Sequence, residues 1–346
     1  MEFMKRFRIT DLGPLRRGLG ADIAQDLAAG TVQFSLTGYI RDSARRLEIP
    51  EARVDTPATR DSVAKCRQSA AKEPTQDLVD KYLVISGIIV FIASTARPDV
   101  AWYAFFISSA TSTPTPEYYA FAVRLFQYLV STADLAITYR AGTSFDSGML
   151  FTPGEEASSQ PHILSDASLR SPRSVSAWCF MLGNAAVFWK VMGQFSPSLS
   201  SGEAEFYALS SAIATAVHMR QLTAELGYQW LSPLLVFCDG SAARQMVQHG
   251  NASHSLRHVD LKWWFANHHV ELGHVSVHPV RGNKNPVNAL TKHTSGASSL
   301  AARSYLLGLP SVTAASAAVL SSLRRVLHSP AVSAATRIQR SWRRAR

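Results

Sequence analysis

The sequence predicts an α/β fold over residues 162–292, preceded by a mostly helical segment. Two short apolar runs, 162–166 and 234–239, each end in an aspartate and are typical of strands. Between them, residues 201–227 place apolar side chains at helical spacing. Strands interleaved with a long amphipathic helix indicate a sheet that has helices packed against it.

The strand-like segments are expected to deliver two aspartates to exposed strand ends. Asp166 follows an apolar run and precedes small polar residues, and Asp239 closes the run that begins at Leu234. Two further strands are expected at 175–182 and 185–192, joined by Gly183-Asn184, which is a signal for a two-residue hairpin. The helix is expected to begin near Ser200, an N-cap candidate followed by acids.

Four segments of this region resemble one known family. They are Ser200-Ser201-Gly202-Glu203-Ala204-Glu205-Phe206-Tyr207-Ala208-Leu209, Phe237-Cys238-Asp239-Gly240-Ser241-Ala242, His254-Ser255-Leu256-Arg257-His258-Val259-Asp260 and Asn285-Pro286-Val287-Asn288-Ala289-Leu290-Thr291-Lys292. Together they resemble the ribonuclease H domain of copia-type retrotransposon polyproteins. Each segment alone is a weak signal, whereas the four in this order are specific.

The resemblance implies a fold and an activity. The fold is a ribonuclease H-like mixed five-stranded sheet with flanking helices, and the activity is hydrolysis of the RNA strand of RNA:DNA hybrids. Two Mg²⁺ or Mn²⁺ ions would be the cofactors, with Asp166 bridging both and Glu205 and Asp239 holding one of them. Hard divalent cations prefer such oxygen ligands, and two of them stabilise an in-line displacement.

Two positions of this predicted site are ambiguous in the sequence: the acid on the helix and the last ligand. Glu203 and Glu205 compete for the helical position, because residues two apart on a helix point about 200° apart; we choose Glu205, which precedes the apolar turn as the family's ligand does. The last position departs from the family, since Asn288 stands where the family has an acid. Asn288 therefore predicts weaker binding of the ion that activates water. A purely structural alternative also exists, because strand ends and helix N-termini attract acids without function.

Residues 1–58 are expected to be a mixed α/β piece with a strand at 30–34 and a helix at 37–47. Phe7-Arg8-Ile9-Thr10-Asp11-Leu12-Gly13-Pro14-Leu15 and the wording that follows resemble the C-terminal part of the copia-type reverse transcriptase. The tyrosine followed by two aspartates of its palm does not occur in this sequence, so no polymerase activity is expected. Residues 78–139 resemble the helical thumb or connection that follows.

Composition divides the rest of the chain. Residues 59–77 and 140–161 are expected to be linkers, the second being rich in Gly, Ser, Thr and Pro. Residues 293–346 are expected to be a basic helical tail. Of the 35 Lys and Arg, 11 follow Glu271 and none of the 25 acids do, so residues 1–271 carry a net charge of −1. The net charge of +10 therefore belongs to the C-terminal part and does not by itself indicate nucleic-acid binding.

The cysteines and the apolar runs predict a soluble protein in the cytoplasm or nucleus. Cys66, Cys179 and Cys238 are odd in number and lie in apolar or helical contexts, which favours reduced, buried thiols. The longest apolar run, 83–93, is shorter than the roughly 20 residues that a membrane span needs, so no membrane partner is expected. Eleven histidines invite a zinc interpretation, but no Cys pair accompanies them. Trp263, Trp264 and Phe265 are expected in the core.

The last residues suggest a second partner. Ile338 and Gln339 with Trp342 and Arg343 resemble the start of an IQ motif, a basic amphipathic helix that binds calmodulin-like proteins. A plain basic helix that contacts nucleic acid non-specifically is the alternative. The rival to a nuclease is thus a catalytically inactive retroelement remnant that binds nucleic acid or calmodulin.

Overall fold

The computed structural model describes residues 13–69, 73–141, 161–170, 173–228, 232–248 and 260–310. The chain divides into a compact unit, Met1–Gly308, and a second unit, Leu309–Arg346. Three sequence predictions lie wholly or mostly outside the described residues: the reverse-transcriptase-like segment at 7–15, the linker at 140–161, of which residues 142–160 are not described, and the IQ-like segment around Trp342.

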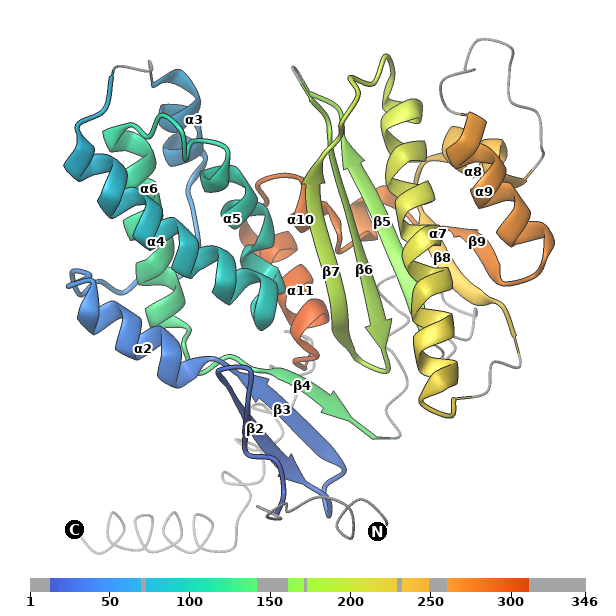
Figure 1. The fold of residues 1–346 in the computed structure, drawn as a ribbon, viewed down its shortest axis with the longest axis horizontal. Coiled ribbons are helices and arrows are strands. Elements are labelled where there is room, and N and C mark those ends of the chain that lie inside the picture. The colour runs from blue at the N-terminus through green and yellow to red at the C-terminus, as the bar shows by residue number, and fades with distance from the viewer. Residues whose placement is uncertain are drawn as a thin grey trace, which may run out of the picture. The chain divides into compact units, whose positions relative to one another are not determined.

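The second half of the compact unit contains the expected mixed five-stranded sheet (Figure 1). Its order is β7-β6-β5-β8-β9; β5, β6 and β7 are antiparallel neighbours, whereas β8 and β9 run parallel to β5. The strands are β5 (His162–Ser168), β6 (Val175–Leu182), β7 (Ala185–Gly193), β8 (Leu234–Cys238) and β9 (Val275–Pro279). The Gly183-Asn184 hairpin is confirmed, because Leu182 pairs with Ala185.

The register of the parallel pair brings the two aspartates together. Ser165 of β5 lies opposite Cys238 of β8, so Asp166 and Asp239 follow at the same edge of the sheet. Parallel strands always end at one edge, which is the usual place for a site in such sheets.

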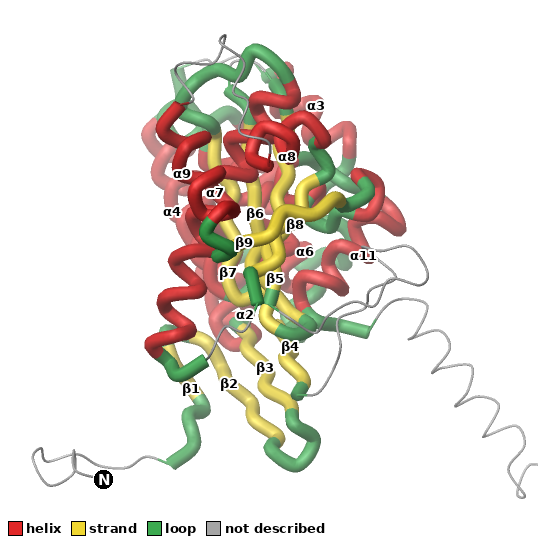
Figure 2. The backbone as a smooth tube through the Cα atoms, turned by 90° about the vertical axis from the view of Figure 1, so that its right-hand side faces the viewer, coloured by secondary structure: helices red, strands yellow, loops and turns green. Residues whose placement is uncertain are grey.

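Helices cover both faces of this sheet (Figures 1 and 2). On one face lie α7 (Ser201–Glu225), α8 (Ser241–Gln248) and α9 (Asp260–Glu271); toward the other lie α10 (Asn288–Thr291) and α11 (Gly296–Leu307). Side chains of β5 alternate between these faces, since Ile163 joins the α7 core and Leu164 joins the α10 core. Asp166, two residues after Leu164, accordingly contacts α10.

The N-terminal half pairs a small antiparallel sheet with helices. The strand and helix expected near residues 30–47 are confirmed as β3 (Thr31–Ser35) and α2 (Thr37–Arg46). The sheet order is β1-β2-β3-β4, with β1 (Arg17–Gly18), β2 (Ala21–Asp26) and β4 (Ile137–Arg140). The segment 78–139 was expected to be helical, but its last residues belong to the strand β4. β4 pairs with β3, which lies about 100 residues earlier in the chain, so its strand conformation depends on a distant partner.

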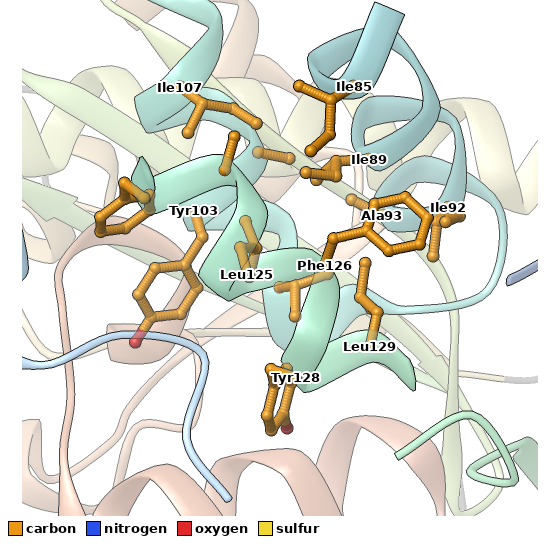
Figure 3. Close-up of a cluster of buried hydrophobic side chains, with 14 of the residues drawn as sticks. Ile85, Ile89, Ile92, Ala93, Tyr103, Ile107, Leu125, Phe126, Tyr128 and Leu129 are labelled. Atoms are coloured by element: carbon orange, nitrogen blue, oxygen red, sulfur yellow. The ribbon is translucent and has the colours of Figure 1, made fainter. Parts of the chain in front are cut away.

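The helical segment shares one hydrophobic core with β2 and α2, and Figure 3 shows part of this core. The segment consists of α4 (Gln76–Thr95), a 3-10 turn η1 (Pro98–Val100), α5 (Ala101–Ser108) and α6 (Pro116–Ser131). Trp102 and Phe106 are buried, and their rings stack with centroids 5.3 Å apart. Trp189 of β7 donates a hydrogen bond to the Ala93 carbonyl, which joins this segment to the large sheet.

Residues 60–68, expected to be part of a linker, instead form α3 (Arg60–Gln68). Thr59 and Ser62 form a reciprocal capping box at its start. Val63 and Cys66 of α3 are buried in the helical core, while the other residues of α3 are mostly polar. A single inward-facing stripe of two residues was too weak a signal to predict the helix from sequence.

A buried polar network lies where α4 is followed by η1 and α5. Both nitrogens of the Arg97 fork donate to the Asp99 carboxylate at 2.8 Å, and Tyr128 also donates to it. Arg303 of α11 donates to the Tyr128 hydroxyl. The Arg97 and Asp99 side chains are 1% and 4% exposed, so this ion pair is part of the packed interior.

α4 is the one helix in the described part of the chain that is long and apolar enough to span a membrane, judged by length and composition. A third of its apolar window is buried, where Tyr82, Ile85, Ile89 and Ile92 enter the helical core. The apolar run 83–93, from which no membrane span was expected, is shorter than α4, because the helix begins seven residues earlier, at Gln76. A core helix passes the same test.

The expected tail begins later than residue 293. α11 packs its Tyr305 and Leu306 against the sheet, and the Tyr305 hydroxyl lies 2.9 Å from Nε2 of His162. The first two turns of α11 are rich in Ala and Ser and contain no acid, so the composition of α11 resembles that of the tail that follows it. For this reason the sequence did not predict that α11 packs against the sheet.

Candidate active site

Asp166 lies near the end of β5 and is almost completely buried, with 4% of the residue exposed. Its Oδ2 accepts a hydrogen bond from the Thr291 hydroxyl, and Nζ of Lys292 lies 4.0 Å from the same oxygen. Asn285 ties this end of β5 to α10, because its amide donates to the Ser165 carbonyl at 2.8 Å. The carboxylate is therefore held by the segment that follows β9.

Glu205 and Asp239 meet beside Gly240. A Cβ at Gly240 would lie 1.9 Å from Oε2 of Glu205, so only glycine leaves room for that carboxylate next to Asp239. Asp239 in turn lies against Gly282, where a Cβ would come within 3.0 Å of Oδ2. Because Gly240 and Gly282 have no side chains, the carboxylates of Glu205 and Asp239 can lie at the same edge of the sheet.

Glu203 takes a different role. Ser200 caps α7 by accepting from the Glu203 N–H at 3.1 Å, and the Glu203 carboxylate accepts from the Leu199 N–H at 2.7 Å. This is the side-chain exchange of a capped helix N-terminus. Glu203 therefore orders the start of α7, and Glu205 is left to face Asp239.

The three carboxylates act on one another electrostatically. Burial raises the pKa of Asp166 to about 6, and the Asp239 charge adds to the increase, against the opposing effects of Lys292 and Thr291. Burial also raises the pKa of Glu205, followed by the charges of Asp239 and Asp166. Like charges disfavour joint ionisation, which is the behaviour expected of carboxylates that lack a cation.

Asp239 also has an atom without a hydrogen-bond partner. Its Oδ1 is buried and receives no hydrogen bond from any described residue. A buried carboxylate oxygen without a donor is costly, and a cation is one way to compensate it.

Asn288, the position where an acid was expected, uses its amide as a brace. Its Nδ2 donates to the carbonyls of Gly282 and Asn285. These bonds hold the 3-10 turn η4 (Gly282–Lys284) against the start of α10. The amide therefore acts as a donor to backbone, a contact that an aspartate could not make.

Thr291 and Lys292 were not assigned a role from sequence, although they close one of the four resembling segments. Their contacts with Asp166 depend on the packing of α10 against β5, which no local pattern reports. Arg244 is a second such residue: it donates to the Cys238 carbonyl at 2.6 Å, and its charge opposes the rise in the pKa of Glu205.

The donor set fits hard divalent cations in chemistry, because it consists of carboxylate oxygens with one unpartnered atom among them. In the described ranges, however, no three His, Cys, Asp or Glu side chains are placed to hold one ion together. The three carboxylates thus lie at one edge of the sheet, but not close enough for all of them to hold the same ion. A bound ion would have to draw them closer together.

No family model matches the chain. It is 21% identical over 295 residues to a retrovirus-related Pol polyprotein from the tobacco (Nicotiana tabacum) transposon TNT 1-94, covering 84% of this chain and 21% of that protein. It is 24% identical to the Pol polyprotein of the Arabidopsis thaliana transposon RE2, covering 83% of this chain and 19% of that one. The chain therefore spans about a fifth of these polyproteins.

A shorter relative matches part of the chain. The secreted RxLR effector protein 161 of Plasmopara viticola is 31% identical over 137 residues, which are 39% of this chain and 89% of that protein. Among solved structures, ribonuclease H1 from Halobacterium salinarum is similar at 18% identity and a TM-score of 0.29, covering 38% of this chain and 92% of that one.

Proposed function

Because this chain belongs to the family of retrotransposon Pol polyproteins, we propose that its second half is a metal-dependent ribonuclease H. The proposed reaction is hydrolysis of the RNA strand of RNA:DNA hybrids, assisted by two Mg²⁺ or Mn²⁺ ions. The proposed location is the cytoplasm or nucleus, and no polymerase activity is proposed.

One observation carries the proposal: Asp166, Glu205 and Asp239, from two strand ends and a helix start, interact at one edge of the sheet. Structural acids have no reason to be assembled there, because each raises the cost of ionising the others. A bound cation offsets the repulsion between the carboxylates. The phosphodiester backbone of a hybrid brings further negative charge, which also favours bound cations.

The residues of the chain have separable tasks in this mechanism. When bound, the ions would activate the attacking water and stabilise the leaving oxygen. Thr291 fixes the rotation of the Asp166 carboxylate through its hydrogen bond, and Lys292 offsets part of its charge while no ion is present. Gly240 and Gly282 allow Glu205 and Asp239 to approach, and Asn288 holds the neighbouring turn.

A small cavity supports contact with a nucleic-acid backbone. Its volume is about 100 Å³, and it is lined by Gln194, Phe195, Tyr207 and Lys262, among others. Nζ of Lys262 lies 4.4 Å from the centre of the Tyr207 ring, and burial lowers the pKa of this lysine. Typical ligand cavities measure about 300–1,000 Å³, so this one admits a single phosphate or sugar edge, not a whole nucleotide.

Replacing Lys262 tests that contact. Lys262→Gln is expected to weaken hybrid binding and to reduce the slope of log K against log salt by about 1, because one phosphate contact is lost. Binding at several salt concentrations measures the slope, and Lys190→Gln on β7 is the matched control. An unchanged slope in Lys262→Gln would remove this cavity from the hybrid-binding surface.

Cleavage of an end-labelled RNA:DNA hybrid tests the proposed function itself. The full chain should cut the RNA strand with Mg²⁺ or Mn²⁺ and should leave duplex RNA and duplex DNA intact, because only the hybrid offers 2′-hydroxyls opposite a DNA strand. Chelation with EDTA should stop the reaction. If no metal concentration supports cleavage while the hybrid still binds, the protein is a binding remnant and not an enzyme.

A further inference from the structure

The C-terminal end of α9 places two imidazole rings side by side. Nδ1 of His269 lies 2.9 Å from Nδ1 of His274, with ring centroids 5.2 Å apart. Both residues are partly exposed, so solvent and dissolved ions reach this helix end. Neither histidine belongs to the carboxylate site, and no step of the proposed cleavage uses them.

The backbone fixes this pair. The His274 N–H donates to the His269 carbonyl at 3.1 Å, the Gly273 N–H donates to the Val270 carbonyl at 3.0 Å, and Gly273 has φ of 68°. These two bonds and the left-handed glycine define a Schellman motif, in which the third-last helical residue contacts the residue that follows the left-handed glycine. That contact is usually hydrophobic, and here two imidazoles make it.

The sheet holds the second ring as well. The His274 carbonyl accepts from the Leu234 N–H at 3.0 Å, which anchors the turn at the start of β8. Phe265 packs edge-on against His269 with centroids 4.5 Å apart. The two Nδ1 atoms are therefore held together by the fold and do not depend on chance rotamers of a loop.

We propose that His269 and His274 form a two-ligand site for a borderline divalent cation of the Zn²⁺, Ni²⁺ or Cu²⁺ class. Metal–imidazole bonds are about 2.0–2.1 Å, so two nitrogens on one such ion stand roughly 2.9–3.4 Å apart, which matches the observed separation. Neutral imidazole is the form that binds, and burial together with the neighbouring histidines lowers the pKa of His269.

The site has two ligands, and water completes the coordination, since the described residues supply no group of three ligands. It lies at the start of β8 and β9, whereas the carboxylates lie at the ends of β5 and β8. Imidazole selects Zn²⁺, Ni²⁺ and Cu²⁺, while carboxylates select Mg²⁺ and Mn²⁺. One chain thus separates two classes of cation at opposite edges of one sheet.

Thermal unfolding of the full chain with NiCl₂ or ZnCl₂ tests the site. Because a ligand that binds only the folded state stabilises it, saturating metal should raise Tm by about 2 °C or more. His269→Asn and His274→Asn should each lose this metal-dependent shift, whatever they do to the Tm without metal. His278→Asn on β9 is the matched control and should keep it, since His278 pairs with Ser276 instead.

Electron paramagnetic resonance with one equivalent of Cu²⁺ supplies a second measurement, which reports the ligand atoms directly and not the stability of the chain. The parent chain should show coupling to two nitrogens, and His269→Asn should show one or none. Equal shifts in the parent and both single variants, or a Cu²⁺ spectrum unchanged by His269→Asn, would overturn the proposal.

Discussion

Asp166→Asn is expected to stabilise the metal-free protein at pH 7 while it abolishes hybrid cleavage. Asp166 has a folded-state pKa of about 6 against an ordinary value of 3.8, mainly because of burial. Between these values the folded chain retains a proton that the unfolded chain has lost, so stability falls as pH rises from about 4 to 6. The full difference corresponds to about 3 kcal/mol, and asparagine does not incur it.

Cleavage should fall in the same variant by at least ~100-fold, since changing even the partners of metal ligands costs 10–100-fold. Urea unfolding from pH 4 to 8 without metal measures the stability, and a hybrid assay measures activity. Asp134→Asn is the matched control, because Asp134 forms an exposed ion pair with Arg41. A parent whose stability does not decline between pH 4 and 6 would contradict the raised pKa, whatever the assay shows.

The sequence predicted the large sheet well because its strands are continuous apolar runs. β5, β6 and β8 are buried along most of their lengths, whereas β7 is buried only at its first two residues but is still a nearly continuous apolar run; such strands can be recognised without knowing their partners. The position of Asp166 and Asp239 at strand ends followed from the same runs. Their convergence depends on β5 and β8 being parallel, which the resemblance implied and no local pattern states.

The misses have a common physical cause. α3 and β4 are short elements whose stability comes from tertiary partners and not from their own periodicity. α11 lies in the segment expected to be a helical tail, and what the sequence did not predict is its packing against the sheet. Trp264 was wrongly expected in the core: it is 58% exposed and stacks on His268 with centroids 4.9 Å apart. Thr291 was overlooked for the same reason as β4, because its contact with Asp166 spans 125 residues.

Asn288→Asp is expected to have two opposite effects. The amide donates to the carbonyls of Gly282 and Asn285, and a carboxylate at this position would face those oxygens without a proton to donate. Loss of both hydrogen bonds should lower the free energy of unfolding by about 1–3 kcal/mol. Residue 288 lies one helical turn before Thr291, whose hydroxyl contacts Asp166, so a carboxylate at 288 would add a full negative charge near the carboxylate edge.

That added charge should tighten Mg²⁺ binding by about tenfold and raise hybrid cleavage, because Mg²⁺ prefers a carboxylate to an amide dipole. Calorimetric titration of the full chain with Mg²⁺ measures the affinity independently of activity. Asn288→Ala removes the same two hydrogen bonds without adding charge, and Asn283→Asp adds the charge at an exposed position of the same turn. Tighter Mg²⁺ binding in Asn288→Asp alone assigns the gain to a fourth carboxylate at the site; equal affinities in Asn288→Asp and Asn288→Ala would show that Asn288 is a structural brace and nothing more.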